Sequence, residues 1–380
     1  MKSVKTTIVG LLLSSMICTG ATVLTSCDMV HQFPEPQMPV DPDDPEDPND
    51  PTPPDEPVYP DDYIKVPIRL IYNTDFYSWE HYYDPIIGDI EEINSGMTLY
   101  PDYPGTSARY DNTRNSGMLE VHVKAYLASD MSKAVEEKIF TILLTGESYD
   151  SDLEIELPKE KDYRIAVWSH LRKENNSNAF YDPTSFSSVS LVSDSYEGNT
   201  DYRDGFRGHI IISTNDEIAD PVEINMKRPM GKFELVTIDL SEFLDRETTR
   251  RSLATRATAD EYHVVVSFPY YFPSSYNVFD DILTDSKSGM RFLTHMTVTG
   301  ESEASLGFEY VFIDNIKDGA VQAKVDIYDP SYERVAGSTV LDIPIRRDHH
   351  TLLRGAFLQE ESDGGIGIDP GFDGDHNVFF

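Results

Sequence analysis

Apolar and polar residues alternate along much of the chain beyond residue 62, and this pattern predicts β-strands. Successive side chains on a strand point to opposite faces of a sheet, so every second residue of a half-buried strand is apolar. Residues 119–127 follow this rule, with Leu119 and Val121 alternating with Glu120 and His122. The other strand candidates before residue 229 are residues 64–70, 139–144, 153–157, 163–168, 210–212 and 222–226.

A second series of strand candidates follows Arg228-Pro229. It comprises residues 233–240, 262–268, 292–299, 306–313, 321–327, 341–345 and 352–358. Only two segments predict helices, residues 131–138 and 241–250, and Ser241 is a residue type that caps helix N-termini. Many short strands at this spacing are typical of sandwiches and barrels, so we predict an all-β protein. A boundary near residue 230 divides it into two halves of ordinary domain size, residues 63–228 and 229–362.

The N-terminus predicts an exported lipoprotein. Lys2 and Lys5 precede a mostly apolar segment, residues 7–23, which ends in Leu24-Thr25-Ser26-Cys27. An apolar residue, two small residues and a cysteine resemble a lipobox, in which the chain is cut before the cysteine and the thiol is acylated. An ordinary signal peptide needs no cysteine there, and a membrane-spanning helix needs about 20 apolar residues. We therefore expect residues 1–26 to be removed, and Cys27 to anchor the chain to the outer membrane, with the rest exposed at the cell surface.

Composition narrows the classes of partner and of site. The 380 residues carry a formal net charge of −36, which argues against binding to nucleic acid or adsorption on anionic lipid. The two cysteines are Cys18, inside the predicted signal, and Cys27. The mature chain would therefore have no disulfide and no cysteine zinc site, and would depend on its hydrophobic cores for stability.

Residues 27–62 are predicted to form an acidic polyproline tether. Polyproline II has three residues per turn, so prolines at every third position form one ridge. Nine prolines recur at that interval, from Pro36 to Pro60, with Asp and Glu between them and no Lys or Arg from Asp28 to Ile64. Charge repulsion extends such a segment, which predicts a disordered spacer. Calcium binding by the acids and docking of a polyproline-binding partner are the alternatives; calcium needs six to eight converging oxygens.

The sequence contains no recognisable catalytic motif, and we predict neither an enzyme nor a cofactor or metal site. HExxH, GxSxG, phosphate-loop and GxGxxG patterns are absent. His349-His350 are expected to be turn or surface residues. The tail, residues 363–380, is rich in Gly and Asp. Asp369, Asp373 and Asp375 with Asn377 weakly resemble a calcium loop, but the spacing differs and the bidentate glutamate is missing.

One aromatic segment is a candidate surface for a ligand or a protein partner. Aromatic planes stack on sugar rings and are enriched in protein interfaces. The alternative is that these rings cap the open end of the first sandwich. The candidate residues are Phe76, Tyr77, Trp79, Tyr82 and Tyr83.

Several short motifs resemble those of the fimbrillin-like surface lipoproteins of Bacteroidales. The strand Tyr163-Arg164-Ile165-Ala166-Val167-Trp168 is similar to the family's Y-x-I-x-x-W strand. Three further motifs are similar to its interdomain segment, its proline-tyrosine-asparagine loop and its closing hairpin, and the end of the chain resembles its tails. They are, in this order, residues 226–235 (Met226 to Leu235), Tyr271-Phe272-Pro273-Ser274-Ser275-Tyr276-Asn277, residues 343–358 (Ile343 to Leu358), and residues 364–369.

The resemblance implies two tandem transthyretin-like or immunoglobulin-like β-sandwiches in a pilus subunit, a pilus anchor or a related surface protein. Pilus subunits of this kind join when an extended strand of one molecule completes a sheet of the next. Major pilins of the family expose the groove after a trypsin-like cut near the N-terminus. Here the first arginine after the tether is Arg69, inside a predicted strand, which favours a monomeric or anchor-type protein.

The sequence thus predicts a non-enzymatic cell-surface lipoprotein that acts in adhesion or in pilus assembly and anchoring. Its expected partners are the membrane, through Cys27, and pilus subunits or other surface proteins. The alternative is a carbohydrate-binding lipoprotein of a glycan-uptake system, with the glycan at the Trp79 segment.

Overall fold

The computed structural model describes residues 62–73, 77–94, 118–143, 152–172, 180–192, 196–315 and 318–359. Contacts divide the chain into two units, Met1–Val58 and Tyr59–Phe380, and all described residues belong to the second. Strands make up 61% of the described residues and helices 7%, which confirms the predicted all-β class. None of the helices in this part of the chain is long and apolar enough to cross a membrane.

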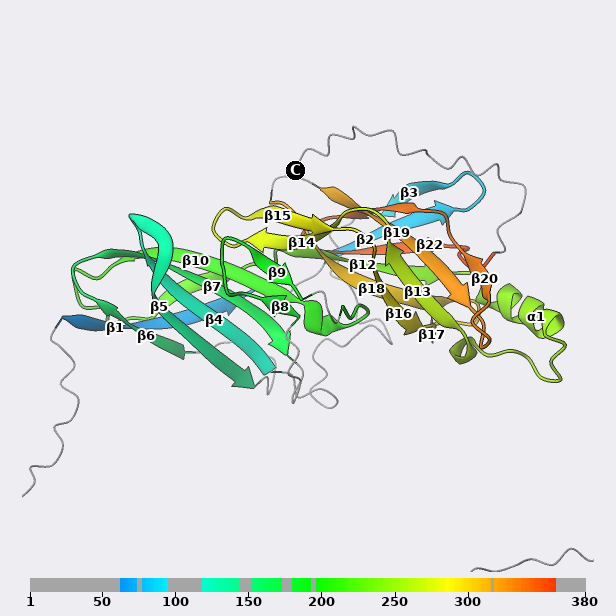
Figure 1. Ribbon diagram of the computed structural model, residues 1–380, viewed down its shortest axis with the longest axis horizontal. Coiled ribbons are helices and arrows are strands. Elements are labelled where there is room, and N and C mark those ends of the chain that lie inside the picture. Colours follow the sequence, from blue (N-terminus) through cyan, green and yellow to red (C-terminus); the bar gives the residue numbers. More distant parts are fainter. Residues whose placement is uncertain are drawn as a thin grey trace, which may run out of the picture. The chain divides into compact units, whose positions relative to one another are not determined.

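Two sheets built mainly from the first half of the sequence enclose one hydrophobic core (Figure 1). Sheet A has the order β11 (Val222–Met226), β1 (Tyr63–Tyr72) and β6 (Asp152–Pro158), and sheet C has the order β10 (Gly205–Ser213), β7 (Asp162–Arg172), β4 (Met118–Leu127) and β5 (Asp130–Leu143). Their alternating apolar residues, such as Val66 on β1 and Val121 on β4, meet between the sheets and are fully buried. We call this the first core.

Three further sheets enclose a larger hydrophobic core. Sheet B has the order β17 (Thr297–Val298), β18 (Ala304–Phe312), β12 (Met230–Thr237), β22 (His349–Gly355), β2 (Tyr77–Asp84) and β3 (Asp89–Asn94). Sheet E has the order β16 (Met290–His295), β13 (His263–Phe268), β19 (Gly319–Tyr328) and β20 (Arg334–Gly337), and β21 (Leu341–Ile345) also pairs with β19. Sheet D has the order β15 (Ile282–Lys287), β14 (Phe272–Asn277), β9 (Val189–Leu191) and β8 (Tyr181–Asp182).

Strands β2 and β3 lie in a different sheet from β1, the strand that precedes them in the sequence. Although β1 lies in sheet A, the next strand along the chain, β2, pairs in parallel with β22, near the end of the described chain. Figure 1 shows blue β2 and β3 beside the orange to red strand β22. Residues 77–94 therefore lie in a sheet with strands from beyond residue 229, and the boundary near residue 230 stays a prediction that does not account for them.

The helical elements are short: η1 (Asp201–Arg203), α1 (Leu240–Arg250) and η2 (Ala259–Glu261). The predicted helix at residues 241–250 corresponds to α1, but its N-cap is Asp239 rather than Ser241. The helix predicted at residues 131–138 is wrong, because these residues form the first part of β5 and pair with β4. His349 and His350 begin a strand instead of forming a turn, and His350 is buried beside Glu234.

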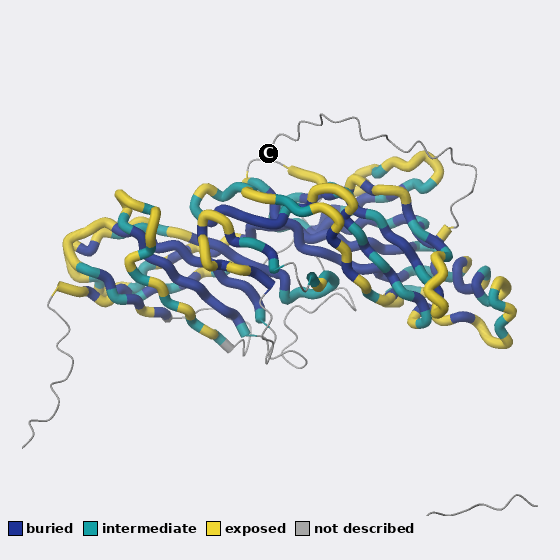
Figure 2. The backbone as a smooth tube through the Cα atoms, viewed as in Figure 1, coloured by how far each residue is buried: buried dark blue, intermediate teal, exposed yellow. Residues whose placement is uncertain are grey.

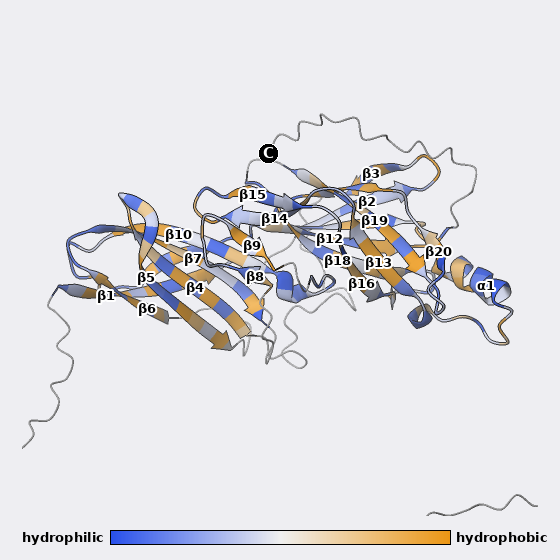
Figure 3. Cartoon of the chain, in the orientation of Figure 1, coloured by the Kyte–Doolittle hydropathy of each residue, from blue (hydrophilic) through white to orange (hydrophobic). Residues whose placement is uncertain are grey.

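The central strands of sheet C, β4 and β7, are buried on both faces. One face supplies aliphatic residues to the first core, as the alternating colours of Figure 3 illustrate. On the opposite face the strands carry Glu120, His122 and Lys124, and Trp168 and His170, and all five side chains are nevertheless buried. Figure 2 shows these strands as nearly continuous dark blue. The pattern of these polar residues is typical of a solvated face, but other parts of the protein cover them.

Candidate functional site

The predicted lipidation site and part of the predicted aromatic surface lie outside the described residues. These are Cys27, the tether, Phe76 and the tail with Asp369, Asp373 and Asp375. The lipobox and the calcium alternative therefore stay predictions. The remaining aromatic candidates lie on β2.

The aromatic residues of β2 pack mostly within the protein. Trp79 is 5% exposed and Tyr83 is 3% exposed, while Tyr77 and Tyr82 are half-buried. The guanidinium group of Arg346 lies 4.1 Å from the centre of the Trp79 ring, and Tyr83 stacks on Phe357 with ring centres 5.3 Å apart. Both rings belong to sheet B, and Trp79 and Tyr83 have little surface left for a ligand.

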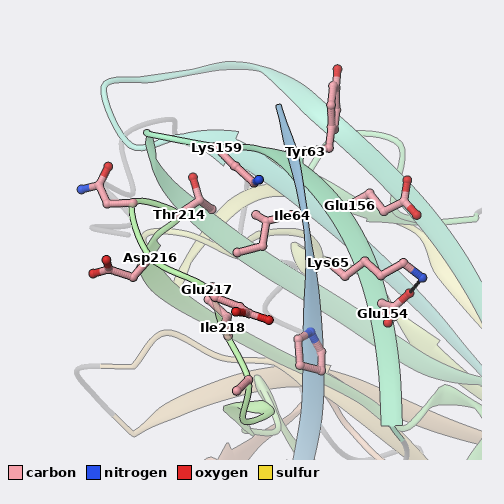
Figure 4. Close-up of a pocket in the computed structure, with 13 residues that line it drawn as sticks. Tyr63, Ile64, Lys65, Glu154, Glu156, Lys159, Thr214, Asp216, Glu217 and Ile218 are labelled. Atoms are coloured by element: carbon pink, nitrogen blue, oxygen red, sulfur yellow. Dashed lines mark hydrogen bonds and ion pairs between the residues drawn. The ribbon is translucent and has the colours of Figure 1, made fainter. Parts of the chain in front are cut away.

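A groove runs beside the first half of β1. Residues Tyr63 to Arg69 pair with β6 on one side, but on the other side the pairing with β11 starts only at Ile68. Among the described residues, no strand therefore pairs with that side of β1 from Tyr63 to Pro67. The groove occupies this position, has a volume of about 1000 Å³, and is bounded on the far side by residues 214–219 (Figure 4).

The lining of the groove combines apolar side chains with charged rims. Figure 4 shows Ile64 on β1 and Ile218 on the facing segment, with Asp216 and Glu217 beside Ile218. On the β6 side of β1, Lys65 binds Glu154 at 3.0 Å. A strand edge with apolar side chains beside it can accept an extended segment through main-chain hydrogen bonds, with side-chain pockets providing selectivity.

A cluster of potential metal ligands lies on the polar buried face of β4 and β7. Glu120 and His122 are two residues apart on β4 and so share a face, and His170 on β7 is the register partner of Glu120. Among the described residues, this is the one group of three His, Cys, Asp or Glu side chains whose ligand atoms all lie within 4.8 Å of one another. The Nε2 atom of His122 lies 2.7 Å from Oε1 of Glu120, and Arg172 donates to Oε2 of Glu120 at 2.8 Å.

These contacts shift two protonation equilibria. The hydrogen bond from His122, with further help from His170 and Arg172, lowers the pKa of Glu120 to about 2 although burial opposes the shift. Burial lowers the pKa of His170 to about 4. Glu120 is thus a carboxylate and His170 a neutral imidazole at neutral pH, the forms in which both groups bind metals.

Neither the groove nor this cluster could be predicted from local sequence patterns. The groove depends on where β11 begins relative to β1, which no local pattern encodes. The Glu120-x-His122 spacing is visible, but it reads as a solvated strand face. His170 lies beyond the predicted strand of residues 163–168, and only the extension of β7 to Arg172 places it opposite Glu120.

Comparison with known proteins assigns the chain to a family. A family model described as a family of unknown function, DUF6562, matches residues 91–379, well over half of the chain. The protein belongs to this family. The match begins within β3, so it leaves out β1, β2 and all residues before them. A search of curated protein sequences found no match.

Several solved structures are similar to this chain at low identity. One is described as a candidate adhesin from Bacteroides ovatus, with 11% identity over 76% of this chain and 89% of that chain and a TM-score of 0.36. Another is the fimbrial anchor protein Mfa2 from Porphyromonas gingivalis, with 10% identity over 72% and 82% of the two chains and a TM-score of 0.33. A third is described as a candidate polysaccharide-binding protein from Bacteroides thetaiotaomicron, with 9% identity over 72% and 80% and a TM-score of 0.34.

Proposed function

We propose that this protein is a non-enzymatic, lipid-anchored surface protein that takes part in adhesion or in the assembly and anchoring of a fimbria. In this proposal Cys27 attaches the chain to the outer membrane and residues 28–62 hold the folded part away from it. The groove beside β1 binds an extended segment of a neighbouring subunit. The partner is thus a protein strand rather than a small molecule.

The observation that carries the proposal is the half-paired edge of β1. Main-chain N–H and C=O groups along an unpaired strand edge form a template for another strand. Natural proteins block such edges with charges, prolines or covering loops. Here Pro67 removes one donor at the end of the half-paired stretch, and residues 214–219 line the other side of the groove. The groove between β1 and that segment has a volume of about 1000 Å³, and Ile64 and Ile218 are among the residues that line it.

The position of Arg69 favours an anchor-type role over that of a proteolytically processed pilin. Arg69 lies inside β1 and pairs with Asp152 on β6 and with Glu223 on β11. A protease needs an extended, accessible backbone, which a strand paired on both sides does not offer. We therefore expect β1 to stay in place and the groove to work in the unprocessed protein.

The carbohydrate-binding alternative is less well supported. Sugar stacking requires an exposed aromatic face, whereas Trp79 is covered by Arg346 and Tyr83 by Phe357. Trp79→Ala is therefore expected to alter packing in sheet B without removing a glycan site.

A photo-crosslinking experiment on intact cells tests the groove. A photoreactive amino acid replaces Glu217, an exposed residue of the groove lining, or Asp342, an exposed residue of β21 outside it, and adducts are identified by mass spectrometry. We expect fimbrial subunits to be captured from position 217 and not from position 342. Identical adducts from both positions, or none from position 217, would contradict the proposal. Capture of a glycan transporter would support the alternative.

The lipid anchor has a separate test with a matched control. Cys27→Ala should abolish incorporation of labelled palmitate and release the protein from the membrane fraction, whereas Cys18→Ala should change neither, because residue 18 belongs to the predicted signal. Continued labelling of the Cys27→Ala protein would show that the anchor assignment is wrong.

A further inference from the structure

The Glu120–His122–His170 cluster has the composition of a transition-metal site. Two imidazoles and one carboxylate are a common ligand set for zinc and for other first-row divalent metals. The three side chains come from adjacent strands of sheet C, which holds their backbones at fixed separations. Ligands on rigid strands can converge on one ion with little rearrangement.

His170 supplies the second, independent observation. The side chain is completely buried, and neither of its ring nitrogens has a hydrogen-bond partner among the described residues. A buried imidazole without any partner is unfavourable, and such a group calls for an explanation such as a water or an ion. Its ring is nearly parallel to that of His122, with ring centres 6.0 Å apart.

The separations within the cluster suit one ion after a small closure. Zinc binds imidazole nitrogen at about 2.0–2.1 Å, so two ligands of one zinc ion lie within about 4.2 Å of each other. The ligand atoms here lie within 4.8 Å of one another, so modest rotation of the rings brings them into range. The 2.7 Å contact between His122 and Glu120 is a hydrogen bond, which an ion bound by both residues would replace.

The positive charge of Arg172 disfavours a cation nearby, but the position of its guanidinium group leaves one oxygen of Glu120 available to a cation. It binds Oε2 of Glu120, whereas Oε1 faces His122. A metal-bound carboxylate commonly accepts a hydrogen bond through its second oxygen, which fixes its orientation. Arg172 therefore donates to Oε2 of Glu120, the oxygen that a metal ion would not bind.

A cavity borders one member of the cluster, His122. It has a volume of about 170 Å³ and is also lined by Lys124, Glu137, Ile139, Pro183 and Thr184. The ammonium group of Lys124 donates to the backbone oxygen of Thr184 at 2.6 Å and lies 3.4 Å from the Glu137 carboxylate. The cavity is several times the volume of a water molecule, so it can admit a hydrated ion and keep a water as a further ligand.

We propose that Glu120, His122 and His170 bind one divalent transition-metal ion of the zinc class. The ion would tie β4 to β7 on the face of sheet C that Tyr181 and its neighbours cover. The fourth coordination position would face the cavity beside His122. This site is independent of the groove and of the proposed function.

Zinc binding to the full chain, purified without a histidine tag and stripped with a chelator, tests the proposal. Competition with a chromophoric zinc chelator gives the stoichiometry and affinity, and cobalt absorption spectra report imidazole ligands. We expect one tight equivalent. Glu120→Gln and His170→Gln should each weaken it by about tenfold or more, given that even outer-shell changes cost 10–100-fold. The control His263→Gln/His295→Gln removes two histidines whose rings are 5.0 Å apart on β13 and β16, and should leave that equivalent unchanged.

A measurement on the wild-type protein covers the case in which a variant does not fold. X-ray absorption of the zinc-loaded protein should show two imidazole ligands. Oxygen ligands alone would assign the zinc to the acidic tether and overturn the proposal. The same conclusion would follow if Glu120→Gln, folded by circular dichroism, bound zinc as tightly as the wild type, or if only the control lost binding.

Discussion

The first core is built from aliphatic and aromatic side chains of sheets A and C, whereas the region around η1 contains three ion pairs, and five of their six charged side chains are buried. We call this second region the charged cluster. Arg203 binds Glu309 at 2.7 Å, Arg228 binds Asp204 at 2.7 Å, and Lys232 binds Asp201 at 2.8 Å. The side chains of Arg203 and Glu309 are 2% and 0% exposed, so this pair is as fully buried as the residues of the first core.

The two regions constrain the fold in different ways. Apolar contacts are non-directional, so the first core tolerates changes that preserve volume. A buried ion requires a particular partner, and removing that partner leaves an uncompensated charge. The charged cluster joins η1 to β12 and β18, segments far apart in the sequence. We infer that it specifies which segments meet, while the first core provides non-specific stabilisation.

The largest expected effect comes from removing one member of the buried pair. Arg203→Met leaves the Glu309 carboxylate buried without its cation, and should lower the free energy of unfolding by about 3–5 kcal/mol. Arg203→Met/Glu309→Gln removes both charges and keeps an acceptor for the Tyr196 hydroxyl, which donates to Glu309 at 2.7 Å. It should recover much of the loss. Urea unfolding measures each variant.

The control for this experiment is an exposed pair of the same type. Arg256 binds Asp245 at 2.7 Å, but the side chains are 50% and 69% exposed. Arg256→Met should therefore change stability by no more than about 1 kcal/mol. If the double variant were as unstable as Arg203→Met, the loss would reflect packing of the arginine rather than an unpaired charge.

A smaller effect is expected at Asp281, a half-buried carboxylate, which binds Arg207 and lies 2.9 Å from Arg347. Burial alone would raise its pKa, but the Tyr276 hydroxyl and the two guanidinium groups lower the pKa below the ordinary 3.8. The unfolded chain then takes up the proton first as the pH falls. The stabilisation is complete above pH 3.8 and is lost as the pH falls through the folded-state pKa.

Asp281→Asn should accordingly lower stability by on the order of 1.5–3 kcal/mol at pH 7, the range for hydrogen bonds to charged groups. The difference from the wild type should shrink in acid. Urea unfolding at pH 7 and pH 3 measures both, and Asp342→Asn controls for the loss of one negative charge at an exposed position. A difference that stays constant between the two pH values would contradict the role of the carboxylate.

Most strands could be predicted because their side chains alternate and the apolar ones are buried. β4 and β7 are examples, since Val121 and Ile165 lie in the first core as the pattern requires. Alternation did not identify residues 131–138 as a strand. These residues of β5 are exposed or half-buried, and they form a strand because they pair with β4. Tertiary pairing there overrides local propensity.

The candidate sites were less predictable because they depend on which strands become neighbours. Nothing near Trp79 indicates that β2 pairs with β22, some 270 residues later. The polar residues of β4 looked solvated because a two-residue period distinguishes two faces without stating what covers each. The partner of Glu120 on β7, His170, became apparent only from the register.

The smallest predicted effect tests whether burial determines how much an isoleucine of sheet C contributes to the free energy of unfolding. Ile165 on β7 is fully buried in the first core, whereas Ile211 on the neighbouring strand β10 is 57% exposed. Ile165→Val removes one methylene group from a packed site and should lower the free energy of unfolding by about 0.5–1.5 kcal/mol. Ile211→Val makes the same chemical change at the surface and should stay within about 0.5 kcal/mol of the wild type. Equal losses in urea unfolding would mean that strand propensity rather than burial sets the stability of sheet C, and the contrast between the first core and the charged cluster would then need another cause.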